Sequence, residues 1–421
     1  MWDVKLQIFK HGLDLKDPDD KMGERIYLPM IDGVPVFYPT YFVTTHLRNN
    51  SPLYQRSVLN DLKMLAMWEY DSNITLTDRI TKGIPLTDVE IQSMANFLSY
   101  DLSTVNKIFT GVKLLPTAYH RVKKNTLRNR IKAAKKYFEF LYPLLCKHPE
   151  KETQLTRLKN KLNGFTPRKI NSHIDIERHL TEEQLDVLLD KIAVGHDENP
   201  WGSDVIQTRN ALMIHTLYET GMRKSELLGL YIEDIDLSKE VIRIRRRHHD
   251  PADPRRHQPH QKTKERDIPV PSALLEALHN YVLNMRGKNE QNKKRRLKHP
   301  VLFVSHSGKT FGAPISISGF ESVSKKLIAT FPVLQGVHYH LFRHHFNYRF
   351  SKMLESSEGW KDMSPEEKAK LDEQTRADLM GWVPNGVMQK LYNARYYKEL
   401  ANKVLSTRSA RFKSAKNGSN K

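Results

Sequence analysis

Residues 337–348 read V-H-Y-H-L-F-R-H-H-F-N-Y, a segment of helical character in which four histidines and an arginine lie among aromatic and aliphatic residues. His340 and Arg343 are three residues apart, so on a helix they share a face and can converge on one small target. Histidine can donate or accept a proton near neutral pH, and arginine offers a rigid fork of donors suited to phosphate. An ordinary polar helix end would contain the same residue types, so the segment alone leaves both interpretations open.

The chain carries a large excess of positive charge. It has 68 lysines and arginines against 48 aspartates and glutamates, a formal net charge of +20. An excess of this size most often reflects a polyanionic partner, and nucleic acid is the partner that it favours. An anionic membrane would instead require a basic amphipathic helix with a strong apolar face near one terminus, and none stands out. The charge therefore predicts binding to a phosphate backbone, but no particular chemistry.

Length and cysteine content narrow the class further. At 421 residues the chain exceeds one typical hydrophobic core, which predicts two or three domains. Cys146 is the single cysteine, so an internal disulfide framework and a cysteine-based zinc cluster are excluded. We see no apolar run long enough to span a membrane, and the N-terminus lacks the basic start and apolar core of a signal peptide. We expect a cytoplasmic, bacterial nucleoid-associated protein without a membrane partner.

The first part of the chain divides into two segments. Residues 1–37 contain short apolar alternations around the turn signal Asp32-Gly33, which predicts a small hairpin of unknown role. Residues 38–150 have a helical pattern, and Thr87 with Glu90 forms a capping box that opens one of the helices. This segment is the first predicted domain.

A basic helix is predicted at about residues 124–142. Its apolar stripe is Leu127, Ile131, Ala134, Phe138 and Leu141, and its other faces carry Lys123, Lys124, Arg128, Arg130, Lys132, Lys135 and Lys136. A solvated face is the usual explanation for such charges. Because they are all of one sign until Glu139, we favour a helix that lies against a nucleic-acid backbone.

Residues 151–179 are basic and are broken by Asn163-Gly164 and Pro167, which predicts a linker. The second domain is expected at residues 180–402. A basic tail, residues 403–421, contains few large apolar residues and is expected to be loose.

Two insertions in the second domain allow alternative interpretations. The loop at residues 248–261, H-H-D-P-A-D-P-R-R-H-Q-P-H-Q, contains histidines that suggest a metal site. No cysteine supports such a site and proline keeps the loop extended, so we favour a basic solvated loop. Lys293-Lys294-Arg295-Arg296 is a second basic insertion, which either contacts a nucleic-acid backbone or is disordered.

Four separated motifs complete the second domain. In order, they are Thr220-Gly221-Met222-Arg223-Lys224-Ser225-Glu226-Leu227, Lys262-Thr263-Lys264-Glu265-Arg266, His340-Leu341-Phe342-Arg343-His344, and Leu379-Met380-Gly381-Trp382 followed by Tyr392. In order and chemistry they resemble the tyrosine recombinases, also called the phage integrase family, over about residues 181–400. The resemblance implies an α+β fold, mainly α with a small β-sheet. A helical core-binding domain that binds DNA, residues 38–150, would precede the tyrosine-recombinase catalytic domain at residues 180–402.

The resemblance also assigns catalytic roles. Arg223 and Arg343 match the arginines that clamp the non-bridging oxygens of a phosphodiester. His340 matches a residue that assists as acid or base. Trp382 stands where most members have histidine, and its indole N–H can donate to a phosphate oxygen but cannot shuttle a proton. Tyr392 matches the nucleophile, whose attack on phosphorus forms a 3′-phosphotyrosyl link.

Two of the assignments keep alternatives. Members usually place the tyrosine ten residues after the glycine of the last motif, and Tyr392 lies one residue further on, so Tyr396 and Tyr397 remain alternatives. A lysine is needed to protonate the departing 5′ oxygen, and Lys262 fits best, with Lys264 as the substitute. No cofactor is implied, because the phosphotyrosyl link keeps the bond energy and the arginines take the electrostatic part of a metal ion.

The sequence therefore predicts a site-specific DNA recombinase or integrase, which cleaves and rejoins DNA strands to integrate or excise a mobile element. Its expected partners are double-stranded recombination sites, other copies of the chain in a tetramer on DNA, and DNA-bending accessory proteins. A type IB topoisomerase uses nearly the same residues to relax supercoils, but the ending Gly381-Trp382 with Tyr392 argues for a recombinase. A catalytically inactive DNA-binding regulator is a third hypothesis, which the presence of every catalytic residue type argues against.

Overall fold

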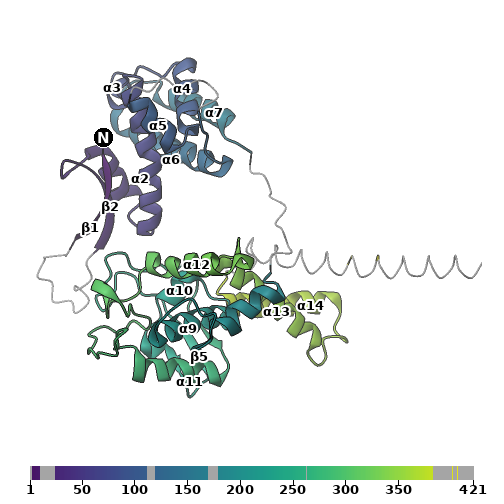
Figure 1. Cartoon of the computed structure of the whole chain (residues 1–421). Coiled ribbons are helices and arrows are strands. Elements are labelled where there is room, and N and C mark those ends of the chain that lie inside the picture. The colour runs from purple at the N-terminus through teal and green to yellow at the C-terminus, as the bar shows by residue number, and fades with distance from the viewer. Residues whose placement is uncertain are drawn as a thin grey trace, which may run out of the picture. The chain divides into compact units, whose positions relative to one another are not determined.

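The computed structural model describes residues 2–9, 24–110, 119–168, 179–261 and 263–382, together with Ala401 and Leu405. The chain divides into two compact units, Met1–Asn171 and Ser172–Lys421 (Figure 1). Each unit is built mainly from helices and contains one three-stranded antiparallel sheet. The predicted α+β class is confirmed. Among the described residues, none of the helices combines the length and apolarity needed to cross a lipid bilayer.

The first unit combines an N-terminal sheet with seven described helices. The two turn residues, Asp32 and Gly33, have φ angles of 47° and 86°, as a two-residue hairpin turn requires, so the predicted hairpin is confirmed. The capping box of Thr87 and Glu90 is also present. The elements are β1 (Asp3–Phe9), β2 (Glu24–Ile31), β3 (Val34–Pro35), α1 (Phe37–His46), α2 (Pro52–Asp71), α3 (Leu76–Thr81), α4 (Asp88–Ser99), α5 (Leu102–Phe109), α6 (Lys124–Leu145) and α7 (Lys151–Phe165).

The N-terminal sheet shares the hydrophobic core of these helices. Leu6 of β1 lies opposite Tyr27 of β2, and both side chains are buried in the same cluster as Leu62 of α2. Gln55 of α2 is buried as well. Its amide accepts a hydrogen bond from the Tyr27 backbone N (3.2 Å) and donates to the Leu47 backbone O (3.1 Å). The sheet is thus an integral part of the first unit.

The first part of the predicted linker is wrong, because residues 151–165 form α7. Three leucines at helical spacing bury one face of this helix in the core of the first unit, and they are Leu155, Leu158 and Leu162. Its basic side chains remain on the surface, where Arg157 and Lys161 form ion pairs with Asp88 at 2.6 and 2.8 Å. Most of the remaining linker, residues 169–178, lies outside the described residues.

The second unit is organised around α9, which packs against α10, α11 and α13. The small sheet β4-β5-β6 places Ile242 opposite Ile268, and both side chains are buried. The elements are α8 (Glu182–Leu185), η2 (Asp186–Lys191), α9 (Asp204–Thr220), α10 (Lys224–Leu228), η3 (Ile232–Asp234), β4 (Ile235–Asp236), β5 (Val241–Ile244), β6 (Arg266–Pro269), α11 (Ser272–Asn280), η4 (Tyr281–Met285), η5 (Gly308–Thr310), α12 (Ile317–Thr330), η6 (Pro332–Leu334), α13 (Tyr339–Ser356) and α14 (Pro365–Met380).

Two left-handed glycines end helices at points of close approach. Gly221 ends α9 with φ 57°, and a Cβ atom added there would lie 2.7 Å from the ring of Phe346 in α13. Gly381 ends α14 with φ 61°, and an added Cβ would lie 2.9 Å from the Lys264 carbonyl oxygen. Only glycine combines this backbone conformation with no side chain. The two glycines therefore allow the four sequence motifs to meet.

Candidate active site

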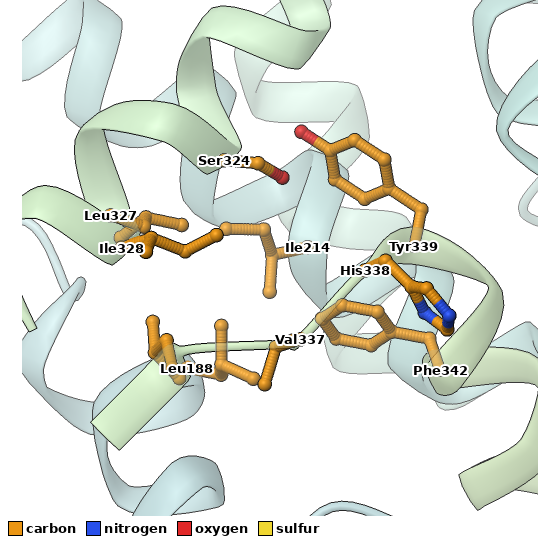
Figure 2. Close-up of a pocket in the computed structure, with 10 residues that line it drawn as sticks. Leu188, Ile214, Ser324, Leu327, Ile328, Val337, His338, Tyr339 and Phe342 are labelled. Atoms are coloured by element: carbon orange, nitrogen blue, oxygen red, sulfur yellow. The ribbon is translucent and has the colours of Figure 1, made fainter. Parts of the chain in front are cut away.

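The histidine–arginine segment forms the start of α13, as predicted. Its first turn is anchored by Tyr339, whose ring stacks on Phe320 at 4.1 Å and whose hydroxyl donates to the Phe320 carbonyl oxygen at 2.6 Å. Figure 2 shows Tyr339 and Phe342 beside an apolar pocket, together with Leu188, Ile214, Ser324, Leu327, Ile328, Val337 and His338. The lining is mainly apolar, so the pocket is poorly suited to bind a phosphate. The packing of Tyr339 and Phe342 beside it positions the helix turn that carries His340.

Arg343 is fully buried and joins two distant helix ends. Its Nη1 donates to the Gly221 carbonyl oxygen at 3.0 Å, and its Nη2 donates to the Met380 carbonyl oxygen at 2.9 Å. The guanidinium carbon lies 5.3 Å from the centroid of the Trp382 ring. Arg343 therefore brings together the first, third and fourth motifs, although in this arrangement its side chain lies beneath the surface.

Glu226 is the acidic centre of the cluster. It is fully buried, its Oε2 accepts a hydrogen bond from the Arg223 backbone N at 2.8 Å, and its Oε1 lies 3.6 Å from Arg223 Nη1. The hydroxyl of Thr263 also donates to it. Burial by itself would raise the pKa of Glu226, but the charges and hydrogen bonds of its neighbours, above all Arg266, hold that pKa at about 2. Glu226 is therefore ionised at neutral pH.

Arg266 also belongs to this cluster, although no role was predicted for it from the sequence. Its Nη2 and Nη1 donate to the two carboxylate oxygens of Glu226 at 2.9 and 3.3 Å, and its Nε donates to the Leu379 carbonyl oxygen at 2.7 Å. A signal for its position was present in the strand. Arg266, Ile268 and Val270 alternate with exposed residues and are all buried, as the two-residue period of a strand dictates.

His340 lies at the edge of the cluster. Its ring meets that of His344 edge to face at 4.8 Å. Partial removal from water lowers the pKa of His340, and the positive charges of Arg343 and Arg223 lower it further. A neutral imidazole, which can accept a proton, is therefore favoured near pH 7.

Trp382 is buried directly after the glycine that ends α14. Its backbone N donates to the Ala377 carbonyl oxygen at 2.9 Å, and its side chain packs with Met380 and Phe346. The backbone N of Lys264 donates to the Gly381 carbonyl oxygen at 3.2 Å, which joins the second and fourth motifs. Of the six predicted catalytic residues, Arg223, His340, Arg343 and Trp382 thus gather at one place.

The other two predicted catalytic residues, Lys262 and Tyr392, lie outside the described residues, as do the alternatives Tyr396 and Tyr397. Lys264, two residues after Lys262 in the sequence, is described and is exposed. The assignments of the lysine and the nucleophile therefore stay predictions.

The basic helix α6 uses some of its cations inside the first unit. Arg130 is buried, and its Nη1 donates to the carbonyl oxygens of Leu98 and Tyr100 at 2.8 and 2.6 Å. Arg128 donates to the Pro167 carbonyl oxygen at 2.9 Å. The prediction that every off-stripe cation lies on a nucleic-acid-binding face is therefore wrong for Arg130, because its guanidinium satisfies two carbonyls at the end of α4. Lys124 and Lys132 remain exposed.

The basic insertion at residues 287–299, here called the basic hairpin, is folded. Its two sides meet where the Arg295 backbone N donates to the Gly287 carbonyl oxygen at 2.7 Å. The Asn289 side chain accepts hydrogen bonds from the backbone N atoms of Gln291 and Lys293. The turn carries five exposed cations, Lys293, Lys294, Arg295, Arg296 and Lys298.

The histidine-rich loop is also folded. The rings of His248 and His260 stack at 4.3 Å, and Arg255 ties the loop to the carbonyl oxygens of Leu228 and Ile315. Within the part of the chain that the structure describes, no group of three or more histidine, cysteine or acidic side chains is placed to hold a metal ion.

Comparison with known proteins finds similarity to one family in the second unit. Residues 178–357 match the model of the phage integrase family. Tyrosine recombinase XerD of Halalkalibacterium halodurans is 31% identical over 196 residues, which are 45% of this chain and 54% of that protein. Tyrosine recombinase XerC of Pediococcus pentosaceus is 24% identical over 251 residues, 58% of this chain and 69% of that protein. The chain thus spans about half the length of the XerD relative.

Among solved structures, the XerH site-specific recombinase bound to palindromic difH substrate aligns with 78% of this chain and 80% of its own chain, at 18% identity and a TM-score of 0.46. The family model covers the motif of Arg223 and the motif of His340 and Arg343. Residues 178–357, which include Arg223, Glu226 and Arg343, are thus similar to the phage integrase family, the tyrosine recombinases.

Proposed function

We propose that the chain is a site-specific DNA recombinase that cleaves and rejoins DNA strands through a 3′-phosphotyrosyl intermediate. The observation that carries the proposal is that Arg223 and Arg343 lie near the buried carboxylate of Glu226, with His340 close enough to both arginines to be affected by their charges. Clustered positive charge at one place suits a phosphodiester whose non-bridging oxygens gain charge during attack. Residues 180–402 are the proposed catalytic domain, and residues 38–150 are the proposed core-binding domain.

The cluster divides the chemical work among its members. Arg223 is the partly exposed arginine, with 27% of its side chain accessible, and it is placed to donate to a phosphate oxygen. Arg343 contributes its charge from inside the unit. The neutral imidazole of His340 accepts or returns a proton, and Lys262, or Lys264 in its place, protonates the departing 5′ oxygen. Tyr392 attacks phosphorus, so the bond energy stays in the link to the enzyme and no nucleotide cofactor is required.

The proposed partners follow from the charge and the chemistry. Double-stranded DNA sites supply the phosphodiesters, and exposed cations such as Lys124 and Lys132 of α6 contact the backbone. Exchange between two duplexes needs four cleavages, so we propose a tetramer of the chain on DNA, with DNA-bending proteins as accessories. Integration or excision of a mobile element is the proposed biological role.

The direct test is capture of the covalent intermediate. The purified chain is incubated with nicked duplexes tiled across the DNA that flanks its own gene, and protein–DNA adducts are isolated after denaturation. We expect adducts at one site, attached through a peptide that contains Tyr392, and none with Tyr392→Phe. Adducts that persist in Tyr392→Phe but vanish in Tyr396→Phe or Tyr397→Phe would move the nucleophile. Failure to form any adduct, or relaxation of plasmids without recombinant products, would contradict the proposed recombinase.

The basic hairpin gives a quantitative prediction for DNA binding. Its exposed cations are held in a fixed turn, so replacing Lys293, Lys294 and Arg296 with alanine should weaken binding without unfolding the unit. If all three contact phosphates, the slope of log K against log salt concentration should fall by about 3, at about 0.9 for each contact. The measurement is fluorescence anisotropy on one duplex between low and physiological salt.

A matched triple variant serves as the control. It replaces three lysines in a segment that also contains many acidic residues, Lys361, Lys368 and Lys370, and it should keep the wild-type slope. Equal slopes in the two variants would remove the hairpin from the DNA interface.

A further inference from the structure

One buried guanidinium contacts three chain segments that carry predicted catalytic residues. Arg266 is 9% exposed and lies at the start of β6. Its partners belong to the start of α10, to the turn before β6 and to the end of α14. These segments are far apart in sequence, since Arg266 is 40 residues from Glu226 and 113 residues from Leu379.

The first contact acts on Arg223. Both terminal nitrogens of Arg266 donate to the Glu226 carboxylate, at 2.9 and 3.3 Å. The same carboxylate accepts the Arg223 backbone N at 2.8 Å and lies beside the Arg223 guanidinium. Because the two oxygens of Glu226 are held from one side by Arg266, they can orient Arg223 from the other.

The second contact acts on the residues that directly follow the proposed general acid, Lys262. Arg266 Nη1 donates to the Thr263 hydroxyl at 3.1 Å and to the Lys264 carbonyl oxygen at 3.4 Å. The Thr263 hydroxyl in turn donates to Glu226. Thr263 and Lys264, the two residues that follow Lys262 in the sequence, are therefore bonded to the same guanidinium.

The third contact acts on the segment that leads to Tyr392. Arg266 Nε donates to the Leu379 carbonyl oxygen at 2.7 Å, in the last turn of α14. Two residues later, the Gly381 carbonyl oxygen accepts the Lys264 backbone N. A Cβ atom at Gly381 would lie 3.0 Å from Arg266 Nη1, so the two segments meet with no space between them.

We infer that Arg266 is a positioning residue for strand cleavage, which holds the arginine, lysine and tyrosine segments in one frame without touching the DNA. This inference rests on the proposed function. A side chain of a different shape cannot replace it, because only a planar fork reaches the carboxylate, the turn and the helix end at the same time.

The test compares Arg266→Met and Arg266→Lys with a matched buried arginine. Arg286 is buried in the same unit and donates to the Val301 and His299 carbonyl oxygens, away from the cluster, so Arg286→Met controls for the loss of a structural arginine. Single-turnover cleavage of a nicked duplex is measured at saturating DNA and divided by the folded fraction from thermal unfolding. We expect Arg266→Met to cleave about 10²-fold more slowly per folded molecule, with DNA affinity unchanged, since misplaced catalytic groups cost rates of this order. Arg266→Lys, which restores one charge and one donor, should recover part of the rate, and Arg286→Met should cleave at the wild-type rate.

Two further readouts separate positioning from stability. Replacing the 5′ oxygen of the scissile phosphate with sulfur gives a leaving group that needs no proton. The gain in cleavage rate on this substrate should therefore be at least about tenfold larger for Arg266→Met than for wild type. In Arg266→Met the Glu226 carboxylate loses its main cationic partner, so the pKa of Glu226 should rise. Protonation of His340 slows cleavage at acid pH in both proteins, so the expected difference is that the cleavage rate of Arg266→Met begins to fall at a higher pH than that of wild type. If Arg266→Met and Arg286→Met cleave equally well per folded molecule, Arg266 is structural only and the recombinase proposal stands. If wild type forms no adduct, the proposed function fails instead.

Discussion

A chain in which methionine replaces Arg343 is expected to lose on the order of 4 kcal/mol of folding free energy in its second unit, because two buried carbonyls lose their donors at about 1–3 kcal/mol each. These carbonyls belong to Gly221 and Met380. Arg343 is fully buried, so water cannot take over the two hydrogen bonds. The measurement is urea unfolding of the full chain, with the transition of the second unit followed by tryptophan fluorescence.

The same substitution is expected to slow strand cleavage by about 10²–10³-fold per folded molecule, because the cluster loses a buried positive charge and the group that holds the first, third and fourth motifs together. Arg343→Lys keeps the charge but cannot reach both carbonyls, so it should fall between the methionine variant and wild type. Arg349 is the matched control, because it also lies on α13 and donates to a carbonyl near the end of α9, that of Tyr218, at 3.3 Å. Arg349 is partly exposed. Arg349→Met should change stability by less than about 1 kcal/mol, as for other exposed charged pairs, and should leave cleavage unchanged. Equal effects of the two methionine variants would contradict the role given to Arg343.

Replacing Glu226 with glutamine should be the second most damaging change. It leaves the buried Arg266 guanidinium without an anionic partner, and breaking a buried ion pair in this way costs about 3–5 kcal/mol. The pKa of Glu226 is lowered from 4.5 to about 2, which corresponds to about 3 kcal/mol of stabilisation, of the same order. The change should also disorient Arg223, whose backbone N bonds to the lost carboxylate oxygen.

The sign of the pH dependence follows from the lowered pKa. The stabilisation by Glu226 is fully present above pH 4.5 and is lost as the pH falls from 4.5 towards 2. We therefore expect the difference in unfolding free energy between wild type and Glu226→Gln to be constant from pH 7 to pH 5 and to shrink below pH 4.5. Glu321→Gln is the control, because Glu321 forms an exposed ion pair with Lys224. It should change stability by less than about 1 kcal/mol at every pH. A difference for Glu226→Gln that stays constant down to pH 2.5 would refute the assignment of a buried, ionised carboxylate.

Local signals in the sequence predicted much of the fold. The cap of Thr87 and Glu90 and the turn at Asp32-Gly33 each act over a few residues, so one helix start and the hairpin could be placed without knowing the tertiary structure. The motifs likewise indicated which residues would meet. The structure brings Arg223, His340, Arg343 and Trp382 together, while the roles of these residues and of Lys262 and Tyr392 stay predictions.

What the sequence did not predict depends on contacts between distant segments. Arg130 and Arg266 were expected at the surface or left unassigned because charged residues are rarely buried, and their partners are up to 113 residues away. The predicted linker at 151–179 contained the leucines of α7, but its lysines and its Asn-Gly pair outweighed their helical spacing. Arg130 and Arg266 both donate to backbone carbonyls of another segment, which no local pattern reveals.

The way in which Arg343 is held has a consequence for acid conditions. Gly221 directly follows the last residue of α9, and Met380 is the last residue of α14, so two helices end against one guanidinium. The C-terminal end of a helix carries about half a negative charge, so two ends offset roughly one positive charge. Peptide dipoles do not titrate, unlike the carboxylate that Arg266 depends on. When the unit loosens in acid, the contacts of Glu226 and Arg266 should open first, while α9 and α14 stay joined through Arg343.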